Sequence, residues 1–411
     1  MSSTIENRRD SATGAVPAEF ARAAAEAIPA APDAPQAESP LARLSPEQIE
    51  ALGREFDAIH DEVYAELGDR DARYIRSTIA LHRRLVLAAR ATLLLSRKRP
   101  AWLAGTAMLS LAKILENMEL GHNIMHGQWD WMNDPDINSQ SWDWDTASPA
   151  DAWKHSHNYE HHTFSNIRGK DRDLGYEIMR IDPHQRWHPV YLLQPLYNLV
   201  LMGFFEWGVA MHDLNFDAIR SGEKSKGAAL TELKAIGVKA RRQIVKDYLA
   251  FPALSAATAP AGSRARTFKS TYWADFTANI VRNVWAHSII FCGHFPDQTY
   301  TFSESEVAEE TRGGWYVRQL LGAANIDGGP LFHLLSGNLS FQVEHHLFPD
   351  MPSSRYSEIA PRVREICRRY GLPYNTGPLH RQLGTVHRTI LRLAFPGGRP
   401  RPKPGPYGQS A

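Results

Sequence analysis

Apolar positions along the chain gather into four long runs that polar and charged segments separate. The longest, residues 187–205, reads WHPVYLLQPLYNLVLMGFF and holds no Asp, Glu, Lys or Arg. The other uncharged runs, at 248–263, 283–296 and 100–112, are shorter. A helix needs roughly 20 apolar residues to cross a bilayer, so only the first run approaches a clean span. On hydropathy alone, membrane helices and the buried helices of a large soluble protein fit this pattern equally well.

The segment that follows residue 44 carries the signals of a helix start. Ser45 suits the N-cap, Pro46 suits the first helical position, and Gln48 can close a capping box with Ser45. Four apolar residues follow at helical spacing: Leu52, Phe56, Ile59 and Val63. Gly68 is a suitable stop for this helix, and a second helix is expected from about Asp71 into the first apolar zone. Because we find no strand-rich block and no fixed-period repeat, the sequence predicts a mainly α-helical fold.

Composition divides the chain into three parts and narrows the classes of function. Residues 1–44 are rich in Ala, Pro and Ser and are predicted to be disordered, residues 45–395 form the folded domain, and residues 396–411 form a basic Pro/Gly-rich tail. A net charge of +1 gives no general attraction to nucleic acid, so no nucleic-acid partner is expected. The polar first residues predict no secretory signal peptide, and only two cysteines, Cys292 and Cys367, favour a reducing cytosol over a disulfide scaffold.

Histidine stands out in this composition because it is concentrated in short windows. Seven of the 18 histidines lie in GHNIMHG, HNYEHH and FQVEHH: His122, His126, His157, His161, His162, His345 and His346. In the first two windows, histidines four apart would share a helix face, with Cβ atoms about 5–6 Å apart. Each pair alone is weak support, but three clusters in one chain indicate a metal site.

An apolar run near residue 290 adds further candidates. His294 lies in FCGHFP, and His287, four residues after Asn283 and seven before His294, shares a helix face with both. Imidazole suits zinc, copper, iron and nickel. Eight imidazoles exceed the four ligands of a tetrahedral zinc ion, so the sequence predicts a site for two metals.

Acidic residues beside the windows are candidates for orienting the imidazoles. Glu119 precedes His122 by three positions, and Glu344 directly precedes His345. Either acid could fix an imidazole tautomer, and an ordinary exposed or capping role fits equally well. The Glu and Glu-x-x-His ligand pattern of ferritin-type di-iron bundles is missing from this sequence. Four other histidines are interpreted as surface or packing residues: His155, His184, His188 and His212.

Taken together, the three windows resemble the histidine boxes of the membrane fatty acid desaturases. That family's pattern is H-x(3–4)-H, H-x(2–3)-HH and (H/Q)-x-x-HH, and here the third box begins with Gln342. The stretches ENMELGHNIMHGQWDWMNDP, RNVWAHSIIFCGHFPD and SGNLSFQVEHHLFPDMPSSR look most like actinobacterial acyl-CoA desaturases of the stearoyl-CoA Δ9 type. The likeness runs over about residues 45–395, which it identifies as a desaturase domain.

The resemblance implies a location as well as a reaction. It implies an integral, multi-pass protein of the inner (plasma) membrane, with a four-helix transmembrane core and a cytosolic helical cap whose active site faces the cytoplasm. It also implies a non-haem di-iron centre that uses O₂. Carried over position by position, the iron ligands are His122, His126, His157, His161, His162, His294, His345 and His346.

Two departures from the family pattern leave alternatives open. Gln342 stands where many members have a ninth histidine, and Gln there is also typical of front-end desaturases of the linoleoyl-CoA Δ6 type. Asn283 and His287 resemble a pair in animal stearoyl-CoA desaturases, so His287 competes with His294, which the GHFP context favours. Related di-iron hydroxylases and monooxygenases share the boxes. A zinc-binding membrane protein without redox chemistry is the alternative from a different class.

The expected fatty acyl substrate, such as an acyl-CoA, explains the need for a metal oxidant. An unactivated methylene has no acidic proton and no leaving group, so acid–base chemistry cannot remove its hydrogens, whereas iron with O₂ and two electrons can. The sequence holds no HPGG signature of a fused cytochrome b5, no Rossmann glycine pattern and no ferredoxin cysteine run. A separate NAD(P)H-dependent flavin and iron–sulfur reductase is therefore expected to supply the electrons.

Overall fold

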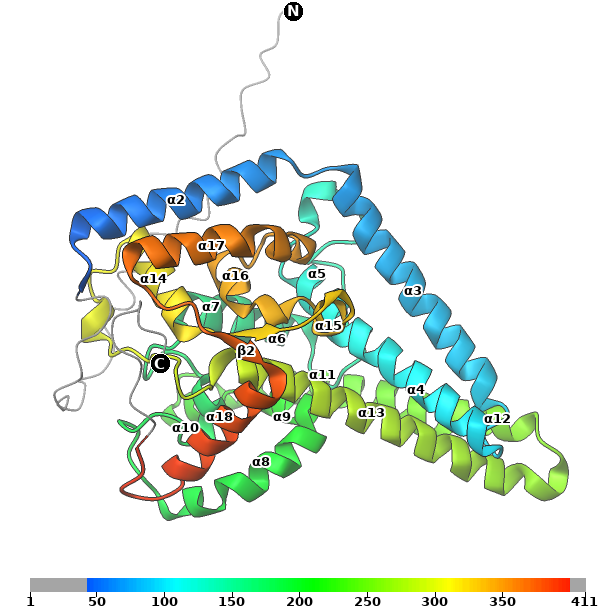
Figure 1. The fold of residues 1–411 in the computed structure, drawn as a ribbon. Coiled ribbons are helices and arrows are strands. Elements are labelled where there is room, and N and C mark those ends of the chain that lie inside the picture. Colours follow the sequence, from blue (N-terminus) through cyan, green and yellow to red (C-terminus); the bar gives the residue numbers. More distant parts are fainter. Residues whose placement is uncertain (1–42, 400–411) are drawn as a thin grey trace, which may run out of the picture.

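Helices make up most of residues 43–399, the range that the structure, a computed structural model, describes (Figure 1). The prediction of a mainly α-helical chain is confirmed. Only two short strands occur in the described range, β1 (Asn325–Asp327) and β2 (Thr376–Pro378), which pair in parallel. The segment predicted to be disordered, 1–44, lies outside the described residues except for its last two, as does most of the predicted tail, 396–411.

A cap of helices surrounds one apolar cluster and begins at the predicted helix start. Its members are α2 (Pro46–Ala65), α14 (Arg312–Gly322), α16 (Gln342–Leu347) and α17 (Tyr356–Tyr370). The capping box is present, because Gln48 N donates to Ser45 Oγ at 3.3 Å and Ser45 N donates to Gln48 Oε1 at 2.9 Å. All four apolar residues of the predicted stripe are buried: Leu52, Phe56, Ile59 and Val63. This element was therefore predictable from local sequence signals alone.

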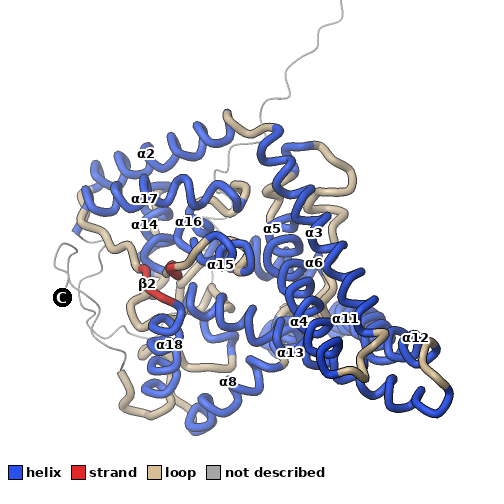
Figure 2. The backbone as a smooth tube through the Cα atoms, turned by 45° about the vertical axis from the view of Figure 1, so that its right-hand side comes forward, coloured by secondary structure: helices blue, strands red, loops and turns tan. Residues whose placement is uncertain are grey.

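Three long helices and the shorter α12 extend away from the cap and converge at their far ends, and we call these helices the arms (Figures 1 and 2). They are α3 (Asp69–Leu93), α4 (Arg99–Leu115), α12 (Phe251–Ala257) and α13 (Arg264–His294). Helix α4 packs against both α3 and α13, and α12 packs against α13. Helix α11 (Lys226–Ile244) leads into α12 through a π-helical turn, η7 (Val245–Ala250). Within the described range, none of the helices combines the length and the apolar content that crossing a membrane demands.

The longest apolar run of the sequence does not form one continuous helix. It is divided into η6 (Pro189–Leu193), α8 (Gln194–Gly203) and the start of α9 (Phe205–His212). Phe204 interrupts the run because its φ of −121° and ψ of 32° are not helical. The predicted four-helix transmembrane core therefore remains a prediction.

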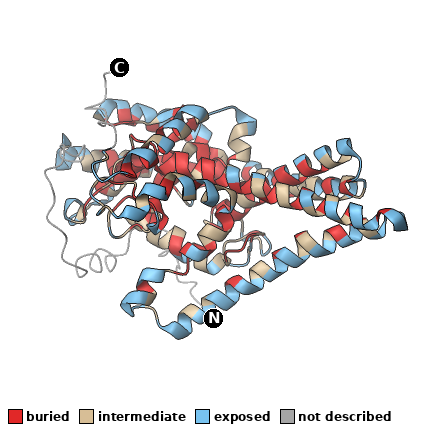
Figure 3. Cartoon of the chain, turned by 90° about the horizontal axis from the view of Figure 1, so that it is seen from below, coloured by how far each residue is buried: buried red, intermediate tan, exposed pale blue. Residues whose placement is uncertain are grey.

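Shorter helices and turns complete the described part of the chain. The helices are α5 (Asn123–Met125), α6 (Ala150–Trp153), α7 (His162–Phe164), α10 (Phe216–Ser221), α15 (Pro330–Leu335) and α18 (Leu379–Leu393). The 3₁₀ turns are η3 (Asp130–Met132), η5 (Leu174–Glu177), η8 (Ala261–Ser263), η9 (Ser305–Val307), η10 (Leu339–Phe341) and η11 (Ser353–Arg355). Buried residues concentrate at the centre of the molecule, where these elements meet (Figure 3).

Each of the first two histidine windows begins in a π-helical segment and ends in or after a short α-helical turn. The π-helical segments are η2 (Glu116–His122) and η4 (Lys154–His161). A π-helical turn holds an extra residue and is frequent at functional sites, because it redirects side chains within a continuous helix. Histidines four apart are compatible with both helix types, so their spacing could not distinguish them.

Candidate metal centre

Eight histidines from four separate parts of the chain meet in one buried cluster. They are His122 and His126 around α5, His157, His161 and His162 of η4 and α7, His294 at the end of α13, and His345 and His346 of α16. Ring centroids lie 4.5 Å apart for His122–His126, 5.0 Å for His122–His345 and 4.8 Å for His161–His294. The structure thus brings together every histidine that the family pattern names.

Within this cluster the histidines form two groups. The ligand nitrogens of His122, His126, His157 and His345 lie within 4.8 Å of one another, and those of His161, His294 and His346 form a second such group. The ring of His162 lies between the groups, with its centroid 4.7 Å from both His126 and His346. An arrangement of two adjacent groups suits two metal ions rather than one, because a tetrahedral ion needs only four ligands.

Several imidazoles present Nδ1 to a protein partner and leave Nε2 without one, and His162 has no partner at either nitrogen. The Nδ1–H groups of His122, His346 and His345 donate to Asn123 Oδ1 at 2.9 Å, to Gln319 Oε1 at 2.9 Å and to the Tyr356 hydroxyl at 3.2 Å. The Nε2 atoms of six members are buried without a hydrogen-bond partner: His126, His157, His161, His162, His345 and His346. Buried polar atoms are normally paired, so these orphaned atoms fit a metal that would accept their lone pairs.

Burial also favours the neutral form that metal binding requires. It lowers the pKa of His126, His162, His294, His345 and His346 well below the usual value, with neighbouring imidazoles adding to the effect. His161 is the exception, because Asp171 and Asp173 outweigh burial and raise its pKa. A cluster of neutral imidazoles offers lone pairs without protons to displace.

Gln342 and the two candidates on α13 occupy different surroundings. Gln342 belongs to the centre, with its Nε2 3.1 Å from His294 Nε2 and its Oε1 unpartnered. His287 lies apart from the cluster: its Nε2 is 3.0 Å from Asn198 Oδ1, and its ring stacks on Phe291 at 3.6 Å. Asn283 donates to Gly203 O at 3.0 Å. The structure therefore brings His294, and not His287, to the other imidazoles.

The two acidic residues singled out in the sequence are buried but meet other groups. Glu119 accepts hydrogen bonds from Tyr74, Asn338 and Ser353. Glu344 accepts from Tyr374 Oη at 2.6 Å and from Asn325 Nδ2 at 2.9 Å. The side chains that orient His122 and His345 are instead Asn123 and Tyr356.

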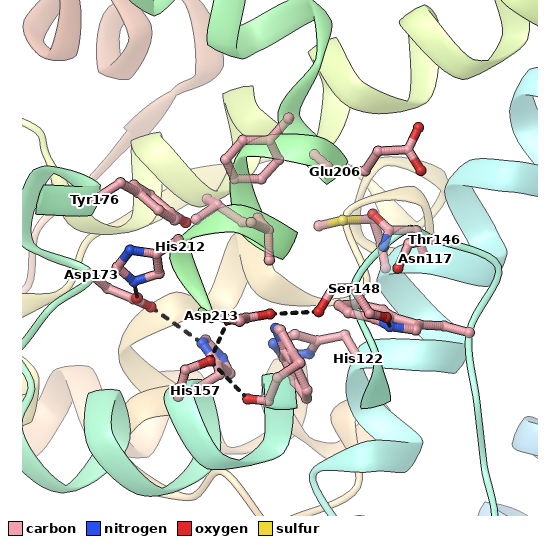
Figure 4. Close-up of a pocket in the computed structure, with 18 of the residues that line it drawn as sticks. Asn117, His122, Thr146, Ser148, His157, Asp173, Tyr176, Glu206, His212 and Asp213 are labelled. Atoms are coloured by element: carbon pink, nitrogen blue, oxygen red, sulfur yellow. Dashed lines mark hydrogen bonds and ion pairs between the residues drawn. The ribbon is translucent and has the colours of Figure 1, made fainter. Parts of the chain in front are cut away.

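The carboxylates that do meet imidazoles, Asp171 and Asp173, were missed by the sequence analysis. His161 Nδ1 lies 3.0 Å from Asp171 Oδ1, and Asp173 Oδ2 lies 3.5 Å from His157 Nδ1. Asp173 Oδ1 also accepts a 2.9 Å hydrogen bond from Nε2 of His212, which was interpreted as a surface or packing residue but is buried (Figure 4). The signal in the sequence was the charged stretch KDRDLG after the second window, which resembles an ordinary polar loop.

A narrow cavity adjoins the histidine cluster and has two unlike walls (Figure 4). His122, His157 and His294 reach it from the cluster. One wall is apolar and includes Met118, Phe205, Val209, Ala286 and Ile290. The other wall is polar: Asp213 accepts hydrogen bonds of 2.5 Å from both Ser148 and Ser156. The cavity therefore places an apolar wall next to imidazoles of the cluster.

Comparison with known proteins points to one family. A family model described as fatty acid desaturase matches residues 100–378. The chain is 47% identical over 356 residues to the NADPH-dependent stearoyl-CoA 9-desaturase of Mycobacterium tuberculosis, which covers 87% of this chain and 82% of that protein. It is 26% identical over 293 residues to the Delta(5) fatty acid desaturase A of Dictyostelium discoideum, which covers 66% of this chain and 58% of that protein. It is also 36% identical over 87 residues to human fatty acid desaturase 3, across 21% of this chain and 20% of that protein.

Proposed function

The chain belongs to the fatty acid desaturase family, and from that premise we propose that it is an O₂-dependent Δ9 desaturase of a long-chain acyl-CoA such as stearoyl-CoA. The mycobacterial relative, which is named for this reaction, supports the substrate and the bond position. The observation that carries the proposal is the pair of imidazole groups whose buried Nε2 atoms have no protein partner. Zinc without redox chemistry explains a set of eight converging imidazoles less well, because one zinc ion needs only four ligands.

We infer that two iron ions are held by eight residues: His122, His126, His157, His161, His162, His294, His345 and His346. When bound, the irons supply the oxidising chemistry with O₂ that removes two hydrogens from an unactivated carbon chain. The chain's own residues do the positioning. Nδ1 hydrogen bonds to Asn123, Gln319 and Tyr356 fix the tautomers and aim the Nε2 lone pairs inward.

The cavity supports an acyl chain as the group placed beside the irons. Its apolar wall removes methylenes from water at a gain of about 0.8 kcal/mol per CH₂. Gln342 also lines the cavity, next to His294. A chain fixed between these walls presents the same methylenes to the metal site in each turnover, and that selects the bond position.

An inside-out distribution of residues supports placing the arms in a lipid bilayer. Large apolar side chains point outward along the arms: Leu87, Leu95, Leu103, Leu249, Leu254 and Trp273 are each about half exposed or more. Four charged residues point inward: Arg90 pairs with Asp247 and Asp275, and Lys113 pairs with Asp247 at 2.7 Å. Arg83 and Arg84 of α3, by contrast, are exposed. Buried charges that are paired internally lower the mean hydropathy of a helix without being exposed to lipid. We therefore place the arms in the plasma membrane and the centre on its cytoplasmic side.

Electrons are proposed to come from a separate NADPH-dependent reductase. The mycobacterial relative is named as NADPH-dependent, and this supports the nucleotide as the ultimate donor. No dinucleotide or ferredoxin motif is found in this sequence, so the flavin and iron–sulfur groups belong to a partner.

A fatty acid profile tests the proposal directly. The wild type, His161→Ala and the control His333→Ala, which alters a histidine that binds Ser340 outside the cluster, are expressed with iron and a compatible reductase in a host without its own desaturase. Gas chromatography–mass spectrometry is expected to detect a Δ9 monounsaturated acid with the wild type and His333→Ala only. A bond nearer the carboxyl group would replace the proposal by a front-end desaturase, and a hydroxylated product by a hydroxylase. Purified protein that contains zinc and forms no product would overturn it.

A further inference from the structure

Two tryptophans form a contiguous aromatic path that begins on the histidine cluster. The indole of Trp153 stacks on the ring of His157, with centroids 4.6 Å apart and planes 22° apart, and lies 5.4 Å from His122 and 5.5 Å from His126. Trp144 follows at 5.0 Å from Trp153. Both rings are more than nine-tenths buried. A redox-active side chain thus contacts three of the proposed iron ligands directly.

The outer end of this path reaches a second pocket, which is open to solvent. Trp144 lines the inner cavity beside the histidines and also this surface pocket, together with Thr146, Asp145, Lys239 and Lys246. The indole N–H of Trp144 donates to Ser148 O at 2.8 Å, which fixes the orientation of the ring. The two tryptophans therefore span the protein between the metal centre and a surface that an external reductant can approach.

A packing role alone does not require these two side chains to be tryptophan. Any large apolar ring could fill the same space, whereas tryptophan and tyrosine are the aromatic side chains that can be oxidised by one electron. We propose, on the basis of the proposed di-iron function, that Trp153 and Trp144 drain oxidising equivalents from the centre to the surface when O₂ is activated without an acyl chain in place. The path would protect the imidazole ligands from self-oxidation.

The electron balance of this step closes without a new reactant. Reduction of O₂ to two waters takes four electrons and four protons. The reductase supplies two electrons, and in normal turnover the acyl chain supplies the other two with its two hydrogens. Without an acyl chain, each of the missing electrons passes from Trp153 to the centre, Trp144 re-reduces the Trp153 radical, and the reductase re-reduces Trp144 at the surface pocket. Solvent supplies the missing protons.

The test uses iron-loaded enzyme with its reductase, NADPH and O₂ but no acyl substrate. Freeze-quenched wild type is expected to show an indole radical by electron paramagnetic resonance, assigned by deuterated tryptophan. Trp153→Phe is expected to lose this signal and to accumulate oxidised ligand histidines several-fold faster per O₂ consumed, measured by peptide mass spectrometry. Trp153→Tyr, which resembles Phe in size but can be oxidised, is expected to recover most of the protection. Trp315→Phe, in the cap core, is the control and should match the wild type.

Trp144→Phe gives a second test that leaves the stack on His157 intact. The Trp153 radical should still form in this variant but should live longer, because its re-reduction is interrupted. Equal histidine damage in wild type and Trp153→Phe, or equal damage in the Phe and Tyr variants at position 153, would overturn the inference. Wild-type enzyme that consumes O₂ but never desaturates stearoyl-CoA would overturn the proposed function instead. The radical signals of the variants would still show whether Trp153 and Trp144 transfer electrons or only fill space.

Discussion

The metal centre and the helical arms both bury polar side chains, but they do so in opposite ways. In the centre, the Nε2 atoms of histidines such as His345 and His346 are buried without any protein partner. In the arms, Arg90, Lys113 and Asp247 are buried in ion pairs with one another. A buried polar group without a partner destabilises the fold unless a ligand pairs with it, whereas a paired one contributes to the scaffold. The presence or absence of protein partners therefore distinguishes a binding site from a set of ion pairs that stabilise the fold.

Removing a histidine of the centre is the change with the largest expected effect on function. His345→Ala should abolish desaturation and iron binding in its group, because the site loses a ligand that no neighbour replaces. The change also removes the hydrogen bond to Tyr356 and leaves a cavity, so the free energy of unfolding of the metal-free protein should fall, and iron content is the specific readout. His287→Gln, which alters a buried histidine outside the cluster, should keep its iron. The measurements are the iron content per chain, by mass spectrometry, and the acyl product. Equal iron in both variants would contradict the assignment of His345 as an iron ligand.

Removing a charge from the arms should have the opposite effect: the fold should lose stability while iron binding is retained. Asp247→Ala removes the carboxylate that Arg90 and Lys113 share and leaves Arg90 with Asp275 and Lys113 with the more distant Asp145. Loss of one partner of a buried ion pair costs up to about 3–5 kcal/mol. The melting temperature in detergent should fall strongly while the protein that remains folded still binds iron. Asp217→Ala, whose partner Arg220 lies 4.0 Å away on the surface, should change stability by about 1 kcal/mol or less. Similar melting temperatures for the two variants would contradict a stabilising role for the ion pairs of Asp247.

Asp173 shares one feature with each region. It is a charged side chain in the interior, like those of the arms, and it contacts imidazoles of the centre. Asp173→Asn removes the negative charge beside His157 Nδ1, and loss of such a supporting partner typically weakens metal affinity about 10–100-fold. Glu344→Gln is the matched control, because Glu344 is also buried and precedes His345 but binds Tyr374 and Asn325. Iron affinity measured by chelator competition should fall for the first variant only. The reverse order would instead support the orienting role for Glu344 that the sequence left open.

The sequence predicted features that depend on neighbouring residues and missed those that depend on distant ones. The start of α2 followed from Ser45 and Gln48, because a capping box is local. The number of histidine windows indicated a shared metal site, but no spacing rule in the sequence brings the ring of His126 to a centroid distance of 4.8 Å from that of His345. Asp173 was missed because its partners lie in other elements.

In the arms, hydropathy has the same limit, because it does not reveal which charged residues pair with partners distant in the sequence. Hydropathy alone left the membrane assignment open, and Arg90 lies among the apolar residues of α3. The structure explains the charge, because Arg90 is held between Asp247 of η7 and Asp275 of α13, which follow it by more than 150 residues. A charge that is paired across helices cannot be distinguished from an exposed one by sequence periodicity.

The smallest expected effect, and the finest test of the centre's surroundings, concerns the pH dependence at His212. Burial lowers the pKa of His212, but hydrogen bonds from the imidazole to Asp173 and Glu177 outweigh burial and raise the pKa to about 9. Arg172, which pairs with Glu177 at 2.9 Å, opposes this rise. Because the folded pKa exceeds that of the unfolded chain, protonation of His212 stabilises the fold fully below pH of about 6.5, and this contribution is lost as the pH rises through about 9.

His212→Gln removes this titration while retaining a hydrogen-bond donor toward Asp173. The difference in unfolding free energy between wild type and variant should shrink by about 2 kcal/mol between pH 7 and pH 9. Thermal melts of both proteins across this range measure it, with His184→Gln as the control for a half-exposed histidine that also meets a carboxylate, Asp182. A difference that stays constant with pH would show that His212 is neutral in the folded protein. A neutral His212 would not offset the negative charge of Asp173. Asp173 would then attract the Nδ1–H of His157 more strongly than it does beside a protonated His212.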